Sequence, residues 1–164
     1  MKRLLLIRHA KSSWSDFSIK DFDRPLNDRG KKDAPVMAKR MLDKGVSIDA
    51  FISSPALRAK KTAEAFAKAY KVPRDSILFF EELYLAGPAA FFDVISKTSD
   101  SFQTIAIFSH NQGITDFANL LTDTRVDELP TCGIFAVRAA TDHWKEFNDS
   151  AKEFWFFTSP KNDL

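Results

Sequence analysis

Two apolar runs in this chain each end in a histidine. Residues 4–7 (Leu-Leu-Leu-Ile) lead into Arg8-His9, and residues 105–108 (Ile-Ala-Ile-Phe) lead into Ser109-His110. Short apolar runs bounded by polar residues are typical of buried strands, and ligands of open α/β sheets bind outside the carboxyl ends of such strands. The chain has only three histidines, so two at strand ends indicate one shared site.

Strand and helix patterns alternate along most of the chain, and the last two strands are expected to pair antiparallel. This order predicts an α/β fold, a three-layer α/β/α sandwich with a mostly parallel central sheet. The expected strands cover residues 4–7, 49–53, 77–80, 104–109, 133–138 and 153–158, and the expected helices cover 27–44, 55–70, 89–97 and 114–121.

Local signals define the ends of the first two helices. Asn27 is a good cap for the first helix and Gly45 a good terminator, whereas Pro35 predicts either a kink or a later start. Ser54-Pro55 predicts that the second helix begins with a serine cap followed by proline at its first position. The polar and aromatic residues 10–26 form a long loop, and loops of that length are often functional.

Length and charge limit the class of protein. A chain of 164 residues predicts one domain spanning residues 1–164, without a cap domain. A formal net charge of +2 favours neither a nucleic-acid nor a membrane partner. The single cysteine, Cys132, cannot form an internal disulfide, and the amino-terminal apolar run is too short for a signal peptide. We therefore expect a cytoplasmic protein.

The residues around the two histidines suit phosphoryl transfer. A neutral imidazole, such as that of His9, is a nucleophile, and nearby cations disfavour its protonation. Arg8 and Arg58 can supply those cations and can also hold phosphate oxygens by paired hydrogen bonds. His110 can donate to a further oxygen. Because arginine and histidine supply the positive charge, we expect neither a metal nor another cofactor.

Three motifs resemble one family. They are residues 4–12 around Arg8-His9, residues 53–64 with Arg58, and Ser109-His110-Asn111. Together they resemble the histidine phosphatase superfamily, also called phosphoglycerate mutase-like. Within it the short chain, Asp23-Arg24-Pro25-Leu26 and Glu82-Leu83-Tyr84 are most similar to the SixA-type phosphohistidine phosphatases. Ala10 stands where the commonest form of the first motif has glycine.

The resemblance implies a role for each matching residue. His9 would be the phosphoacceptor, Arg8 and Arg58 the phosphate clamps, and His110 the second histidine of the pocket. Glu82 would be the general acid, although SixA-like members can lack a clear acid. The residues expected to bind phosphate or substrate are Arg24, Ser12, Asn111 and Trp14.

The resemblance also implies the activity. The expected function is that of a metal-independent phosphatase with a phosphohistidine intermediate on His9, acting on a phosphohistidine-bearing protein. A small phosphate ester is the chief alternative substrate. A phosphoglycerate-type mutase and a non-catalytic phosphate-binding module are further alternatives.

Other polar residues are expected to have no part in the chemistry. His143 is expected on the surface, and Cys132 as a small buried filler. The acidic side chains near the first loop do not have the spacing of a cation-binding loop and are expected to be solvated; they are Asp16, Asp21, Asp23 and Asp28.

Overall fold

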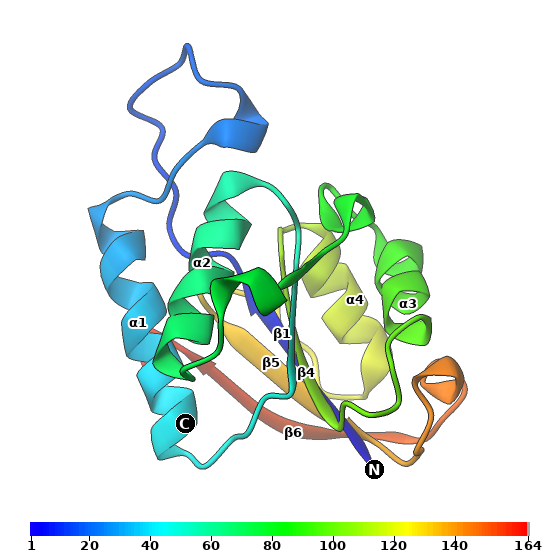
Figure 1. Cartoon of the computed structure of the whole chain (residues 1–164). Coiled ribbons are helices and arrows are strands. Elements are labelled where there is room, and N and C mark those ends of the chain that lie inside the picture. The colour runs from blue at the N-terminus through cyan, green and yellow to red at the C-terminus, as the bar shows by residue number, and fades with distance from the viewer. Residues whose placement is uncertain (164) are drawn as a thin grey trace.

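The computed structural model describes residues 1–163 and contains a seven-stranded sheet in the order β3-β2-β4-β1-β5-β6-β7 (Figure 1). The strands are β1 (Lys2–Arg8), β2 (Ala50–Ser53), β3 (Leu78–Phe79), β4 (Thr104–Ser109), β5 (Ile134–Ala139), β6 (Lys152–Ser159) and β7 (Asn162–Asp163). The helices are α1 (Asp28–Asp43), α2 (Leu57–Ala69), α3 (Pro88–Ser96) and α4 (Gly113–Leu121). Short 3-10 turns are η1 (Asp21–Asp23), η2 (Arg74–Ser76), η3 (Glu81–Leu83) and η4 (Trp144–Glu146).

The pairing of the strands confirms the predicted fold class. β3, β2, β4 and β1 are parallel, whereas β5 runs antiparallel to β1 and β6 antiparallel to β5. Central strands such as β4 are buried along their whole length, which matches the continuous apolar runs expected of parallel strands covered on both faces.

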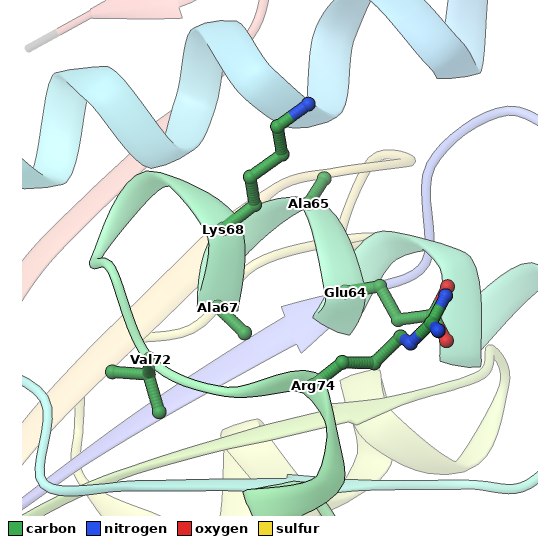
Figure 2. A pocket seen from close by; sticks show the side chains of 6 residues that line it. All are labelled: Glu64, Ala65, Ala67, Lys68, Val72 and Arg74. Atoms are coloured by element: carbon green, nitrogen blue, oxygen red, sulfur yellow. The ribbon is translucent and has the colours of Figure 1, made fainter.

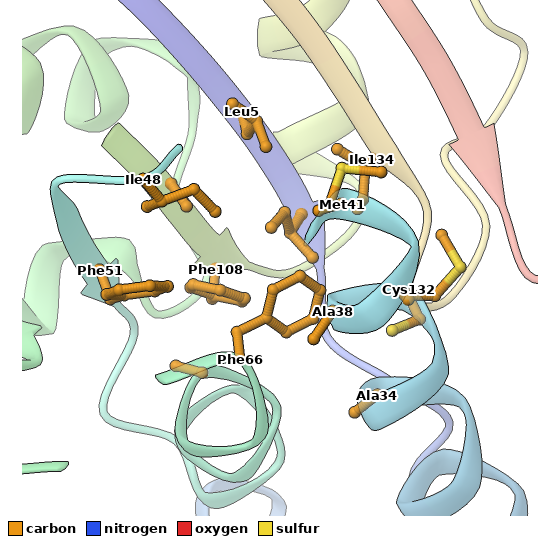
Figure 3. Packing of buried hydrophobic residues seen from close by; sticks show 14 of the residues in the cluster. Leu5, Ala34, Ala38, Met41, Ile48, Phe51, Phe66, Phe108, Cys132 and Ile134 are labelled. Atoms are coloured by element: carbon orange, nitrogen blue, oxygen red, sulfur yellow. The ribbon is translucent and has the colours of Figure 1, made fainter. Parts of the chain in front are cut away.

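Helices cover both faces of the sheet, with α1 and α2 on one side and α3 and α4 on the other (Figure 1). Alternate residues of β1 therefore enter two separate cores, Leu5 and Ile7 in one and Leu4 and Leu6 in the other. In the first core, the Phe66 ring of α2 meets the Phe108 ring of β4 at 5.1 Å between centroids (Figure 3). Such edge-to-face contacts stabilise the core beyond the effect of apolar burial alone.

The structure confirms the predicted start of α1 and corrects the predicted start of α2. The Asn27 side chain accepts a hydrogen bond from the Gly30 amide at 2.9 Å and caps α1, which continues through Pro35. A later start of α1 is therefore wrong. α2 begins at Leu57 rather than Pro55, because Ala56 is still extended with ψ of 139°. Ser54 is thus not its N-cap, although its Oγ accepts from the Ala56 amide at 3.2 Å.

The connections leave β1 and β4 toward opposite faces. β1 leads to α1 and its neighbour β4 leads to α4 on the other side of the sheet (Figure 1). This divergence opens a crevice at the carboxyl ends of the two strands, the usual ligand position in such folds. Within residues 1–163, no helix combines the length and the apolar character needed to cross a membrane.

Candidate active site

His9 and His110 lie side by side because β1 and β4 are in register. Arg8 pairs with Ser109 across the two strands, and the His9 amide donates to the Ser109 carbonyl at 3.0 Å. The two imidazoles consequently emerge at the same level, with ring centroids 5.2 Å apart. Both are buried, with exposed fractions of 6% for His9 and 3% for His110.

Each imidazole is held by one hydrogen bond. His9 Nδ1 lies 2.7 Å from the Ala10 carbonyl oxygen, which can only accept, so the proton is assigned to Nδ1 and the lone pair to Nε2. His110 Nε2 lies 2.7 Å from Ser54 Oγ, and His110 Nδ1 is buried without a partner. The Ala10 amide in turn donates to Thr62 Oγ1 at 2.9 Å, which ties the His9 backbone to α2.

Burial keeps both imidazoles neutral. It is the largest cause that lowers the pKa of His9 to about 3, with Arg58, Arg8 and Arg24 adding repulsion and the Ala10 carbonyl opposing. Burial likewise lowers the pKa of His110 to about 3, assisted by His9 and Arg58. The expectation that cations keep the imidazole neutral is thus correct in sign, but desolvation is the larger effect.

Three arginines surround the histidines. Arg58 is only 4% exposed and Arg24 only 7%, and Arg8 donates to the Leu129 carbonyl at 2.9 Å. Burial also lowers the pKa of Arg8, although not enough for an arginine to lose its charge at neutral pH. Buried guanidiniums need acceptors, yet the Nε atoms of Arg8 and Arg58 have no hydrogen-bond partner.

The long loop forms one wall of the site. The Ser12 hydroxyl accepts from Arg24 at 3.0 Å, and the Arg24 guanidinium stacks 3.4 Å above the Trp14 ring. The base of the loop rests on α1 so closely that a Cβ at Gly30 would lie 2.1 Å from the Lys11 carbonyl oxygen. Glycine at position 30 therefore permits the approach that brings the loop over the histidines.

Asn111 also lines the site. Its side-chain amide donates to Glu128 at 2.9 Å, and Glu128 also meets Arg8 at 3.4 Å. Glu128 was not a candidate in the sequence, because it lies 17 residues beyond Asn111 in a segment without a motif. Its contacts place it as a partner of two candidate residues.

Asp21 is the main addition to the site. It was expected to be a solvated loop acid, but its carboxylate meets Arg24 at 3.2 Å and Arg58 at 3.1 Å and accepts from the Tyr84 hydroxyl at 2.5 Å. Partial burial works to raise its pKa, but the Tyr84 hydroxyl and the two arginines outweigh this and lower the pKa to about 2. No local sequence signal distinguishes Asp21 from the other acids of the loop, because its partner Arg58 lies 37 positions away in the sequence.

Glu82 does not join these residues. Its carboxylate points to α3, where it lies 3.6 Å from Lys97 Nζ, and Asp93 and partial burial raise its pKa. The turn η3 buries its neighbour Leu83, which directs Glu82 away from the pocket. Its position does not support the predicted role as general acid. Tyr84, two residues further, lines the pocket instead.

The site residues enclose a cavity of about 460 Å³. It is lined by Arg8, His9, Lys11, Ser12, Trp14, Asp21, Arg24, Arg58, Tyr84, Leu85, His110, Asn111 and Thr131. Another hollow of about 500 Å³ lies beside α2, where Glu64 and Arg74 flank small apolar side chains (Figure 2). Neither histidine of the candidate site lines this second hollow.

The remaining predicted residues have ordinary surroundings. His143 is exposed and pairs with Asp100 at 3.0 Å, and Cys132 is buried with its pKa raised by burial. Among residues 1–163, no group of three or more His, Cys, Asp or Glu side chains is arranged to hold a metal ion.

A family model and sequence relatives identify the class of protein. Residues 4–84 match the histidine phosphatase superfamily, branch 1. An uncharacterized chloroplastic protein of Arabidopsis thaliana is 31% identical over 153 residues, which cover 88% of this chain and 70% of the relative. An uncharacterized protein of Mycobacterium tuberculosis is 29% identical over 94% of this chain and 100% of its own. The chain belongs to the histidine phosphatase superfamily, and it is a phosphatase.

Solved structures share its fold. The SixA protein of Agrobacterium tumefaciens has a TM-score of 0.80 at 23% identity, covering 97% of this chain and 99% of the other. A protein histidine phosphatase SixA in complex with tungstate has a TM-score of 0.81 at 20% identity, covering 97% of each chain. A mycobacterial glucosyl-3-phosphoglycerate phosphatase in complex with VO3 has a TM-score of 0.75 at 10% identity, covering 97% and 100%.

Proposed function

We propose that this phosphatase transfers the phosphoryl group of its substrate to His9 and then to water, without a metal ion. The substrate that we propose is a phosphohistidine side chain of another protein. His9 is the nucleophile, and Arg8, Arg58, Arg24 and His110 hold the phosphoryl group.

The observation that carries this proposal is the state of the His9 imidazole. Its Nδ1 proton bonds to the Ala10 carbonyl at 2.7 Å, and its pKa is lowered to about 3. A neutral ring fixed in this tautomer keeps the Nε2 lone pair available at physiological pH, which is what a nucleophilic imidazole requires.

Unsatisfied donors around His9 support the binding of an anion. Among residues 1–163, five buried side-chain polar atoms have no hydrogen-bond partner, and three of them are Arg8 Nε, Arg58 Nε and His110 Nδ1. Ser54 Oγ already accepts from the Ala56 amide, so its own proton can be donated to His110 Nε2, which would leave the His110 proton on Nδ1. Phosphoryl oxygens would satisfy such donors.

The two chemical steps balance without a further reactant. In the first step the Nε2 lone pair of His9 forms a bond to phosphorus, and the leaving group departs with the electrons of its own bond. In the second step a water oxygen attacks phosphorus, the His9 nitrogen recovers its lone pair, and the water releases a proton with inorganic phosphate. The arginines and His110 stabilise the charge on the equatorial oxygens in both steps, which is the principal need of phosphoryl transfer.

The surroundings of the pocket favour a phosphohistidine protein as substrate. An imidazole is a better leaving group than an alkoxide, and Glu82, the expected acid, lies outside the pocket beside Lys97. Exposed apolar side chains border the pocket, with exposed fractions of 62% for Trp14 and 71% for Leu85. Such a border suits contact with a protein surface. The likeness to SixA in complex with tungstate also supports this choice.

A small phosphate ester is the second candidate. The cavity of about 460 Å³ lies within the range of small-molecule sites, and the fold is shared with a glucosyl-3-phosphoglycerate phosphatase. Asp21 is the one carboxylate among the lining residues, and its lowered pKa makes it a poor proton donor for an alkoxide.

The test is phosphate release from a phosphohistidine protein and from p-nitrophenyl phosphate, with and without a chelator. His9→Ala is expected to abolish release, whereas His143→Ala, which changes an exposed histidine, is the matched control and is expected to retain it. Isomerised product without free phosphate would indicate a mutase. Tight phosphate binding without turnover of either substrate would indicate a binding module.

A further inference from the structure

The Asp21 carboxylate occupies the groups that we propose bind the phosphoryl group. Arg58 Nη2 donates to Asp21 Oδ2 at 3.1 Å, and Arg58 Nη1 donates to the Asp21 carbonyl oxygen at 2.7 Å. Arg24 Nε donates to Asp21 Oδ1 at 3.2 Å. One acidic residue of the loop therefore accepts from two of the three site arginines.

A carboxylate and a phosphoryl group make the same demands on a guanidinium. Both are anions that accept paired, charge-assisted hydrogen bonds, and two anions at one arginine repel each other. Both Nη atoms of Arg58 are engaged by Asp21, so an incoming phosphoryl group must either displace the Asp21 carboxylate or bind beside it. Either route makes the phosphoryl group bind more weakly than it would in a pocket without the negative charge of Asp21.

The place of Asp21 in the loop permits displacement. It lies on η1, in the part of the chain that stands away from the sheet and α1 (Figure 1). The base of this loop is fixed separately, by the Ser13 amide bonded to the Pro25 carbonyl at 2.8 Å and the Asn27 amide bonded to the Lys11 carbonyl at 3.0 Å. The carboxylate can therefore move while the loop remains anchored beside His9.

We propose that Asp21 is a specificity-determining residue, an internal anion that competes with the phosphoryl group of the substrate for Arg58 and Arg24. This inference rests on the proposed function. Free phosphate carries no leaving group whose contacts with the protein could offset this competition, so it binds weakly and leaves after turnover. A phosphorylated protein offsets the same cost through contacts of its leaving group with the apolar border around Trp14 and Leu85.

The test is calorimetric titration of the whole protein with inorganic phosphate. Asp21→Asn keeps the size of the side chain and removes its charge, and it is expected to bind phosphate about tenfold more tightly, which corresponds to about 1.4 kcal/mol. Tyr84→Phe removes one donor from the carboxylate and is expected to tighten binding by a smaller factor. Asp23→Asn is the matched control, because Asp23 lies on the same turn and is exposed, and it is expected to stay within twofold of the wild type.

Each other result would overturn the inference in a distinguishable way. If wild type binds phosphate and Asp21→Asn binds it equally or more weakly, Asp21 positions the arginines rather than competing for them, and the proposed function stands. If phosphate binds neither protein, the phosphate pocket itself is wrong, and the inference fails with it. If Asp23→Asn tightens phosphate binding as much as Asp21→Asn does, the effect comes from the net charge of the loop and not from the contacts of Asp21 with the arginines.

Discussion

Acidification from pH 7 to pH 5 is expected to destabilise this protein through the two buried histidines of the pocket. Both imidazoles are neutral in the folded protein, with the pKa of His9 and of His110 lowered to about 3, whereas an unfolded chain gives histidine a pKa of about 6.5. Between these values the unfolded state binds more protons than the folded state. Stability contributed by the neutral rings is therefore present above about pH 6.5 and is lost as the pH falls toward 3.

The expected size of the effect follows from those pKa values. For one histidine, the linkage relation gives a loss of about 2 kcal/mol in the free energy of unfolding between pH 7 and pH 5, and for both about 4 kcal/mol. This is a large part of the stability of an ordinary domain. Asp21, whose pKa is lowered to about 2, contributes with the same sign only below about pH 4 and does not disturb this window.

Urea unfolding at pH 7, 6 and 5 measures the loss directly. His9→Gln and His110→Gln are each expected to remove about half of the pH dependence. His143→Gln is the control: the hydrogen bond to Asp100 raises the pKa of His143, so its effect has the opposite sign and is lost as the pH rises. Two results would show that the neutral rings do not stabilise the fold: a wild-type stability that is the same at pH 7 and pH 5, or a pH dependence of the unfolding free energy that is unaltered in both pocket variants.

Three substitutions test other parts of the account. Glu82→Gln is expected to change kcat/KM on p-nitrophenyl phosphate less than twofold, because its carboxylate faces Lys97; a tenfold loss would restore Glu82 as the acid. Trp14→Ala, which removes the ring under Arg24, is expected to raise KM for a phosphohistidine protein while leaving Tm nearly unchanged, and unchanged kinetics with every substrate would contradict this. Phe108→Ala leaves a cavity against Phe66 and is expected to lower the free energy of unfolding by about 3–5 kcal/mol, measured by urea titration. A loss below about 1 kcal/mol would mean that neighbouring core side chains move to fill the cavity.

The sequence predicts the backbone of the site well, because strand ends and helix starts depend on local patterns. The apolar runs before His9 and His110 identify β1 and β4, and their parallel register brings the two imidazoles together. The motif that begins at Ser54 identifies Arg58 as a site residue, although α2 begins later than the Ser-Pro signal predicts. In each case the prediction rests on residues that are adjacent in sequence.

Contacts made across the fold are harder to predict. The hydrogen bond between Asp21 and Tyr84 joins residues 63 positions apart, and nothing local marks Asp21 as different from the other acids of the loop. The orientation of Glu82 depends on how η3 packs on α3, which the chain pattern does not specify. The predictions of a single domain without a cap and of the individual catalytic roles remain predictions.

In the proposed reaction, His9 carries the phosphoryl group between the two steps. This phosphoenzyme can be detected by quenching the enzyme in alkali during turnover of a phosphohistidine protein, digesting it, and locating the bound phosphate by mass spectrometry. We expect acid-labile, alkali-stable phosphate on the peptide that contains His9, present in the His143→Ala control and absent in His9→Ala. Phosphate on a different residue of this chain, or undiminished turnover by His9→Ala, would contradict it.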